Sequence, residues 1–292
     1  MIPTILARQG WTIWHLLGAA VLCGAAVAFT WPAWVDIVRI ATADEEQSHV
    51  FLVPVVALWM VWARRLRFRF CPPKGTMIGP PIVAVGWILS SVGFNNSIQS
   101  FWHGGAVLIA IGSVLSVFGK HVLFRFLPAF AVLVFLVPTP GGIRQAISGP
   151  LQTATAFTTQ AILETVGVPV ERSGNLLTIN GIDVAVAEAC NGMRMVFAVV
   201  LVSYAFAFGM PLRNFTRLVV LVASPIAALI CNIIRLLPTV VLYGYSPQST
   251  ANAFHDISGW LMLPAAFMLL LGVMRVLNWA QIPVNRYTLA YQ

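Results

Sequence analysis

Charged residues are scarce in this chain. They make up 9% of the 292 residues, whereas about 25% is usual for a soluble domain. Hydrophobic residues make up 59%, so too little polar surface remains to cover a water-soluble fold. The shortage excludes a soluble protein, and repeated apolar stretches of about twenty residues predict transmembrane helices instead. Segments of alternating polarity are also lacking, so helices are the structures that can satisfy the backbone in lipid.

Cysteine is rare as well, and its spacing excludes several kinds of site. The four cysteines have neither the CxxC pattern nor zinc-finger spacing, so we expect no disulfide framework, metal or cofactor. Cys23 and Cys231 lie in apolar runs and are interpreted as packing residues. Cys71 follows a basic cluster and is expected to face a reducing cytoplasm. Cys190 is considered separately below.

Acidic residues number nine against seventeen basic ones, which gives a net charge of +8. An excess of this sign can indicate nucleic-acid binding, but here the basic residues stand at the ends of apolar runs, as in residues 64–69. With the amino terminus in the cytoplasm, twelve of the seventeen basic residues fall inside. The distribution therefore predicts membrane topology and argues against a nucleic-acid partner.

The predicted fold is an all-α polytopic membrane protein, a single domain over residues 1–292 with no appended soluble domain. The first span is interpreted as an uncleaved anchor because its apolar run is long for a secretory signal and further spans follow. About eight transmembrane helices are expected, over residues 12–30, 49–63, 76–94, 101–118, 122–138, 190–209, 217–237 and 257–277. This orientation places residues 139–189 on the outer side of the membrane.

The outer segment before the sixth span has two predicted parts. Residues 144–166 have helical apolar spacing and are expected to form an amphipathic helix on the membrane surface. Residues 168–186 are expected to form a short hairpin, because Asn180-Gly181 is a strong two-residue turn signal.

Three polar clusters fall at the outer ends of the sixth, seventh and eighth predicted spans. Cys190 starts a helix, where free N–H groups and the helix dipole favour the nucleophilic thiolate; the alternative is inert packing. His255 has a suitable ordinary pKa for a general base and acid, unless it is only an interfacial histidine. Arg235 is a costly charge inside a span, and it either stabilises an oxyanion or snorkels to the interface.

Four further residues accompany these three. Arg194 lies one turn after Cys190 and either assists the thiolate or pairs with Glu188, which is interpreted as a charge partner. Asn232 lies one turn before Arg235. Asp256 either orients the His255 ring or is simply an acidic residue in the first turn of the eighth helix.

The same residues resemble a known family. Glu-Ala-Cys-Asn-Gly-Met-Arg at 188–194, Asn-x-x-Arg at 232–235 and His-x-x-x-Gly at 255–259 are similar, in that order, to the three signatures of the exosortase/archaeosortase family. Ser-His-Val-Phe-Leu-Val-Pro at 48–54 resembles its amino-terminal segment, with Val50 in place of the usual glycine. The proline turn at 137–140 also fits, and the resemblance extends over about residues 45–275.

The resemblance implies a membrane-embedded cysteine transpeptidase with Cys190, Arg235 and His255 as its catalytic set. Histidine in the third signature is similar to the bacterial members, which implies a bacterial inner membrane with the active site on its periplasmic side. The implied substrates are exported proteins that end in a Pro-Glu-Pro-type motif, one transmembrane helix and a basic tail. They would be held as a thioester and passed to an acceptor, either a lipid or a glycan amine, within the lipid bilayer.

Two rival functions remain open at this stage. A small-solute transporter is compatible with many spans, and Arg194 and Arg235 would then line an anion path; it predicts polar residues at midplane on several helices. A non-catalytic component of exopolysaccharide export would leave the cysteine idle. Loss of activity in a Cys190→Ala variant distinguishes transpeptidation from both.

Overall fold

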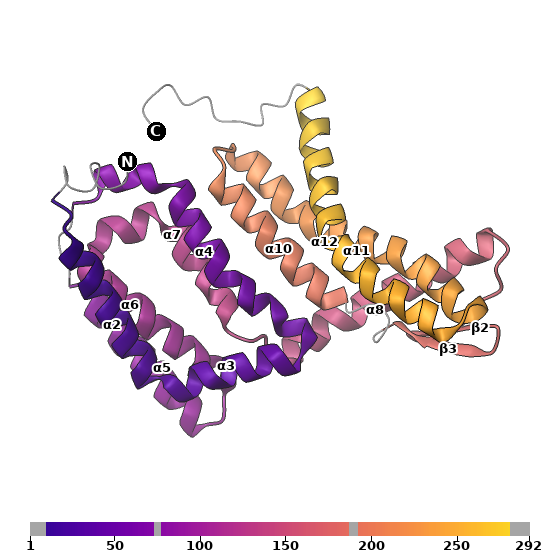
Figure 1. Ribbon diagram of the computed structural model, residues 1–292, viewed down its shortest axis with the longest axis horizontal. Helices are drawn as coiled ribbons and strands as arrows, with labels where there is room; N and C mark the ends of the chain where they lie inside the picture. The colour runs from indigo at the N-terminus through magenta and orange to yellow at the C-terminus, as the bar shows by residue number, and fades with distance from the viewer. Residues whose placement is uncertain (1–9, 73–76, 187–191, 281–292) are drawn as a thin grey trace. The chain divides into compact units, whose positions relative to one another are not determined.

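The computed structural model describes residues 10–72, 77–186 and 192–280. They fall into two compact units, which are considered separately (Figure 1). Among the described residues, unit 1 comprises 10–72, 77–140 and 208–210, and unit 2 comprises 141–186, 192–207 and 211–280. The described elements are predominantly helical, as expected for a polytopic membrane protein.

Unit 1 contains the helices before the long periplasmic segment predicted from the sequence. A break at Thr30 separates its first two helices, and a kink at Gly119 lies inside the longest one. Its elements are α2 (Ile13–Phe29), α3 (Trp31–Ala43), the 3-10 helix η1 (Glu45–Phe51), α4 (Leu52–Ala63), η2 (Arg65–Phe70), α5 (Gly79–Asn95), α6 (Gln99–Arg125), α7 (Leu127–Ala131) and η3 (Val132–Leu136).

Glycines at the contact between α5 and α6 allow the two helices to approach closely. A side chain added at Gly93 would collide with the backbone of Trp102, and one added at Gly105 would collide with the backbone of Ser90. Membrane helices associate through such small residues because lipid supplies no hydrophobic force between them. The kink residue Gly119 has φ +79°, a conformation that other residues rarely adopt, so it ends the regular helix between the fourth and fifth predicted spans.

Unit 2 combines helices with a small antiparallel sheet. Its elements are α8 (Gly141–Thr165), β1 (Glu171–Ser173), β2 (Leu176–Ile179), β3 (Ile182–Ala185), most of α10 (Gly192–Gly209), α11 (Asn214–Tyr245) and α12 (Gln248–Trp279). The sheet order is β1-β2-β3. The β2–β3 turn lies at Asn180 and Gly181, both with positive φ, as a tight hairpin requires.

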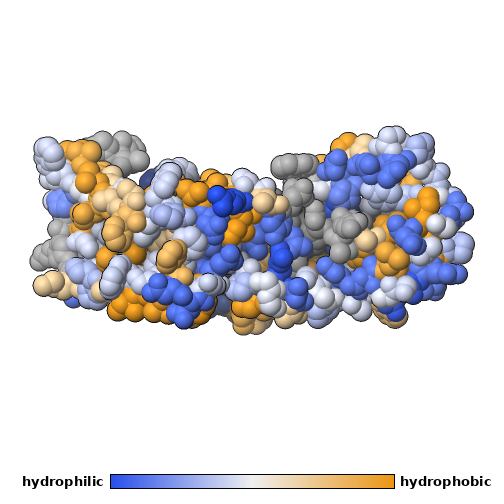
Figure 2. All heavy atoms as spheres, turned by 90° about the horizontal axis from the view of Figure 1, so that it is seen from below, coloured by the Kyte–Doolittle hydropathy of each residue, from blue (hydrophilic) through white to orange (hydrophobic). Residues whose placement is uncertain are grey.

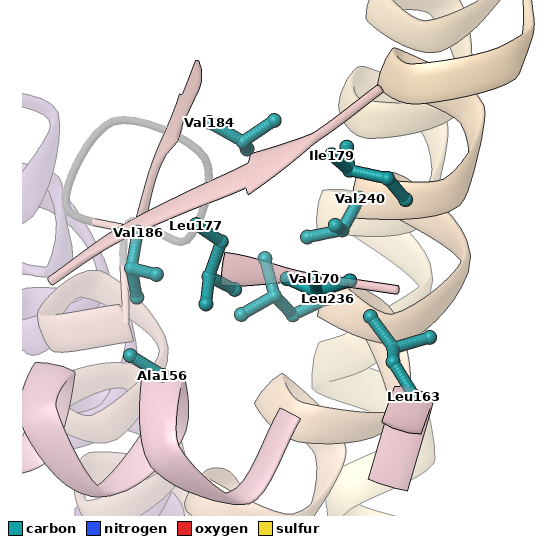
Figure 3. Packing of buried hydrophobic residues seen from close by; sticks show 9 residues of the cluster. All are labelled: Ala156, Leu163, Val170, Leu177, Ile179, Val184, Val186, Leu236 and Val240. Atoms are coloured by element: carbon teal, nitrogen blue, oxygen red, sulfur yellow. The ribbon is translucent and has the colours of Figure 1, made fainter. Parts of the chain in front are cut away.

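The sheet packs on helices through one apolar face. Leu177 and Ile179 of β2 and Val184 of β3 are buried in a cluster with Leu236 and Val240 of α11. Figure 3 shows these strand residues and the two α11 residues directed toward one another. The alternate residues of the hairpin face away from this cluster, so burial specifies its register. The side-chain amide of Asn180 also donates to the Gly244 carbonyl of α11 at 3.1 Å.

The helices present a surface suited to lipid. Large apolar side chains are exposed along them, including Trp14, Leu58 and Leu218, and hydrophobic residues reach the surface among hydrophilic ones (Figure 2). Among the described residues, three helices are long and apolar enough to span a membrane, and six spans result if each bent pair counts as one. A helix lies at each of the eight predicted spans, but the number eight stays a prediction.

Two helices of unit 2 extend beyond the spans predicted for them. The seventh span was predicted to end at residue 237, whereas α11 continues to Tyr245; the eighth was predicted to begin at 257, whereas α12 begins at Gln248. Apolar runs indicate where a helix crosses lipid, but a helix can continue beyond the apolar zone because its hydrogen bonds are internal. Arg235 and His255 consequently lie well inside their helices.

Candidate active site

Arg235 links α11 to α12. Its side chain is buried, and its Nε donates to the hydroxyl of Ser258 at 3.2 Å. One terminal nitrogen donates to the backbone carbonyl of His255, also at 3.2 Å. A buried guanidinium needs such partners because an unpaired charge away from water is strongly unfavourable. The seventh and eighth predicted spans therefore meet at the residues that the sequence analysis selected.

Ser258 was missed by the sequence analysis, although its position offers a signal. It lies three residues after His255 and therefore on the same face of α12. Its hydroxyl accepts from Arg235 and donates to the His255 carbonyl at 3.1 Å. Gly259 lies close to the same guanidinium: a Cβ added at this glycine would be 3.6 Å from Nη2 of Arg235. Ser258 and Gly259 thus shape the contact between Arg235 and the backbone of α12.

His255 lies on α12 with its ring largely buried and next to an exposed carboxylate. The ring Nδ1 is 3.3 Å from Oδ1 of Asp256, whose side chain is 79% exposed. The alternative interpretation of Asp256 as a first-turn acid was wrong, because α12 begins eight residues earlier, at Gln248. Asp256 is close enough to hold one ring nitrogen, but solvent weakens an interaction of that length and exposure.

Two polar atoms near Arg235 are covered and unsatisfied. Nε2 of His255 and Oδ1 of Asn232 are buried and have no hydrogen-bond partner in the part of the chain that the structure describes. Asn232 is one turn from Arg235 on α11 and is itself buried. Native proteins leave few buried polar atoms unsatisfied, so both atoms are candidates for pairing with a group outside the described residues.

A cavity of about 380 Å³ lies next to His255 within unit 2. All four residues of β3 form one wall, and His255 and Asn252 of α12 contribute to another. The hydroxyl of Tyr243 donates to the Asn252 side chain at 2.8 Å and also lines this cavity. The cavity therefore lies between the hairpin and α12, the helix that carries His255.

Some predicted site residues are not described. Cys190 and Glu188 lie outside the described residues, and Arg194 is placed on α10 without a description of its side chain. The structure therefore brings together Arg235, the His255 backbone and Asn232, with Asp256 adjacent. The nucleophile assignment rests on the sequence alone.

Comparison with known families agrees with the resemblance seen in the sequence. The family model of transmembrane exosortases matches residues 34–272, which is most of the chain. The chain belongs to the transmembrane exosortase family. Exosortases are membrane transpeptidases that act on exported proteins. No curated protein and no solved structure matches the chain.

The other two exosortase-like segments meet in unit 1. Gln47, just before residues 48–54, donates through Nε2 to the Thr139 carbonyl at 3.4 Å and accepts from the Thr139 N–H at 3.3 Å. His49 is buried, and its Nδ1 lies 3.1 Å from the Glu46 carbonyl. This exosortase thus joins its η1 segment to the proline turn at 137–140 through a side-chain amide.

Two of the remaining cysteines have environments that suit inert residues. Cys231 is buried in an apolar cluster with Ala227, Ala228 and residues of neighbouring helices, as expected for a packing residue. Cys71 is buried, and its thiol lies 3.5 Å from the Arg67 carbonyl. Burial raises the pKa of the Cys71 thiol, although the positive charge of Arg125 partly opposes this. A thiol with a raised pKa is a poor nucleophile at neutral pH.

Proposed function

We propose that this exosortase is a cysteine transpeptidase of a bacterial inner membrane, with its amino terminus in the cytoplasm and its active site on the periplasmic side. Its substrates are exported proteins that end in a Pro-Glu-Pro-type motif, a transmembrane helix and a basic tail. The observation that supports this best is the contact of Arg235 with the backbone of His255, beside a cavity and two covered, unsatisfied polar atoms.

The proposed first step transfers the substrate to the enzyme. The Cys190 thiolate attacks the carbonyl carbon of the scissile peptide bond and forms an S–C bond. The C–N bond then breaks as protonated His255 gives its proton to the leaving nitrogen, and a thioester remains on Cys190. Nε2 of His255 is suited to this transfer because no described residue engages it, while Nδ1 lies beside Asp256.

The second step releases the substrate onto an acceptor. An amine on a lipid or glycan attacks the thioester carbonyl, forms a new C–N bond and loses a proton to His255. The C–S bond breaks, and the Cys190 thiolate is restored. Water in place of the amine would give hydrolysis with the same residues.

Arg235 has two roles in this proposal. Its bonds to Ser258 and the His255 carbonyl position the helix turn that carries the imidazole. We also assign to its charge the stabilisation of the oxyanion of the tetrahedral intermediates. A transporter or an export scaffold requires neither this link nor a reactive thiol.

The test is cleavage of a membrane-anchored reporter that ends in the tripartite signal and an epitope tag. We expect the Cys190→Ala chain to leave the reporter intact. A chain with Cys23, Cys71 and Cys231 all replaced by alanine should cleave it nearly normally. Intact-mass measurement should show an acyl adduct on Cys190 that hydroxylamine removes.

Normal processing by Cys190→Ala would overturn the assignment of the nucleophile. If the wild-type chain left every such reporter intact but its deletion impaired solute uptake or polysaccharide export, one of the rival functions would replace transpeptidation.

A further inference from the structure

The sheet in unit 2 has an open edge at β3. Its order is β1-β2-β3, and no further strand pairs with β3 among the described residues. An exposed edge presents backbone N–H and C=O groups that another chain can bind, and proteins usually cover or blunt such edges. Here the edge strand forms one wall of the 380 Å³ cavity.

The register identifies which groups point outward. Across a two-residue turn, Ile182 pairs with Ile179 and Val184 with Leu177, and these are the pairs that exchange backbone hydrogen bonds. The same alternation continues at Val186, whose N–H donates to the Asn175 carbonyl at 2.9 Å. The N–H and C=O groups of Asp183 and Ala185 therefore face away from β2.

The cavity relates this edge to the candidate catalytic residues. Asp183 and Ala185 line it together with His255, so an extended segment placed along β3 would lie beside the imidazole. The chain reaches residue 190 only five positions after Ala185. A hydrogen bond from Asn180 and the apolar cluster beneath the sheet hold the hairpin on α11, which makes the edge a fixed template.

We propose that the exported-protein substrate binds as an added strand on β3, with its main chain paired to the outward groups of Asp183 and Ala185. This mode of recognition, in which an extended peptide completes a sheet, derives affinity from main-chain hydrogen bonds. The inference rests on the function proposed above, because it concerns the peptide that the transpeptidase would cleave.

A Pro-x-Pro motif is compatible with this geometry. In a strand, successive N–H groups point to opposite sides, so only every second residue of the bound peptide donates to β3. Prolines two positions apart can both lie where the missing N–H would have faced away, while the residue between them donates. The motif would then determine which peptide residues pair with β3, in addition to marking the protein as a substrate.

The first experiment removes an outward donor from the enzyme. Ala185→Pro deletes an N–H that does not pair with β2. With the tripartite reporter and the full chain in membranes, Ala185→Pro should raise KM about tenfold with kcat nearly unchanged. This pattern is expected because strand pairing is present in both the ground state and the transition state.

The second experiment leaves the enzyme unaltered, so it remains decisive if Ala185→Pro fails to fold. A short synthetic peptide that carries the motif competes with the reporter, and its non-proline backbone nitrogens are methylated one at a time. Strand addition predicts weaker competition at every second position, with little change at the positions between.

Two contrary outcomes are distinguishable. If the wild-type chain cleaves the reporter in a Cys190-dependent manner but methylation has no period of two, strand addition is overturned and the transpeptidase stands. If the wild-type chain cleaves no reporter, the proposed function fails and this inference fails with it.

Discussion

At the scale of single residues, the site depends on the hydrogen bonds that the guanidinium of Arg235 donates. Arg235 is buried and donates to two groups of α12, the Ser258 hydroxyl and the His255 carbonyl. A guanidinium offers several donors in a rigid, planar arrangement, whereas an ammonium is a compact and strongly hydrated point charge. The two basic side chains are therefore not interchangeable at this position.

We expect Arg235→Lys to reduce kcat for signal removal by about 10²-fold, the scale of other oxyanion donors. The measurement is reporter cleavage in membranes that contain equal amounts of folded wild-type and variant protein. Arg213→Lys is the matched control, because Arg213 is exposed at the start of the same helix and should tolerate lysine. An Arg235→Lys rate within about a factor of two of wild type would mean that Arg235 only anchors or snorkels.

The thiol of Cys71 should react slowly, because burial raises its pKa. The thiolate fraction of a group with a raised pKa is smaller than usual at neutral pH and grows only as the pH rises toward that pKa. In a chain with alanine at the other three cysteine positions, alkylation should be slow near pH 7 and accelerate into the alkaline range. The denatured chain is the control and should react faster at every pH. Equal rates at pH 7 would contradict the buried environment.

At the scale of elements, the two units use different devices to hold helices together. In unit 1, α5 and α6 approach through glycines that leave no room for a side chain. In unit 2, α11 binds the sheet through apolar side chains and binds α12 through a buried arginine. The first device tolerates no added volume, and the second tolerates no loss of a polar partner.

Two neighbouring glycines on α6 allow a matched test of the close packing between α5 and α6. Gly105→Ala should destabilise the protein by about 1–3 kcal/mol, because its Cβ would collide with the backbone of α5. Gly104→Ala should change stability by about 0.5 kcal/mol or less, because its Cβ would make only an ordinary contact with Val137 at 3.8 Å. Denaturant unfolding in micelles measures both, and equal values would exclude close packing at Gly105.

Periodicity and turn chemistry indicated the helices and the Asn180-Gly181 turn, because those signals are local. The helix ends at Tyr245 and Gln248 could not be predicted from hydropathy, which reports contact with lipid rather than helix length. The hydrogen bond from Arg235 to Ser258 depends on the rotation of two helices about their axes. Packing sets that rotation, and no single segment encodes it.

At the scale of the whole molecule, the family match extends over both units. Residues 34–272 include most of unit 1 and nearly all the described helices of unit 2, whereas Arg235, His255 and the cavity belong to unit 2 alone. The described site therefore accounts for only part of the region that the family shares. The single-domain organisation and the eight spans stay predictions.

The proposed orientation can be tested by cysteine labelling in a chain whose four native cysteines are replaced by alanine. Ser173→Cys lies on β1 and should react with a membrane-impermeant maleimide in intact spheroplasts. Asn214→Cys lies at the start of α11 and should react only after the membrane is permeabilised. Both positions are exposed in the structure, so a reversed pattern would mean an inverted topology rather than a hidden thiol.

The open edge of β3 has a consequence for the range of proteins that one such enzyme can process. Main-chain pairing is nearly indifferent to side-chain identity, so every exported protein with a suitable extended segment would gain similar affinity from it. Discrimination would then depend on the few side chains around the cavity, chiefly Tyr243, Gln248 and Asn252. A cell with many such substrates would present them to the enzyme as mutual competitors, and their relative abundance in the membrane would decide the order in which they are processed.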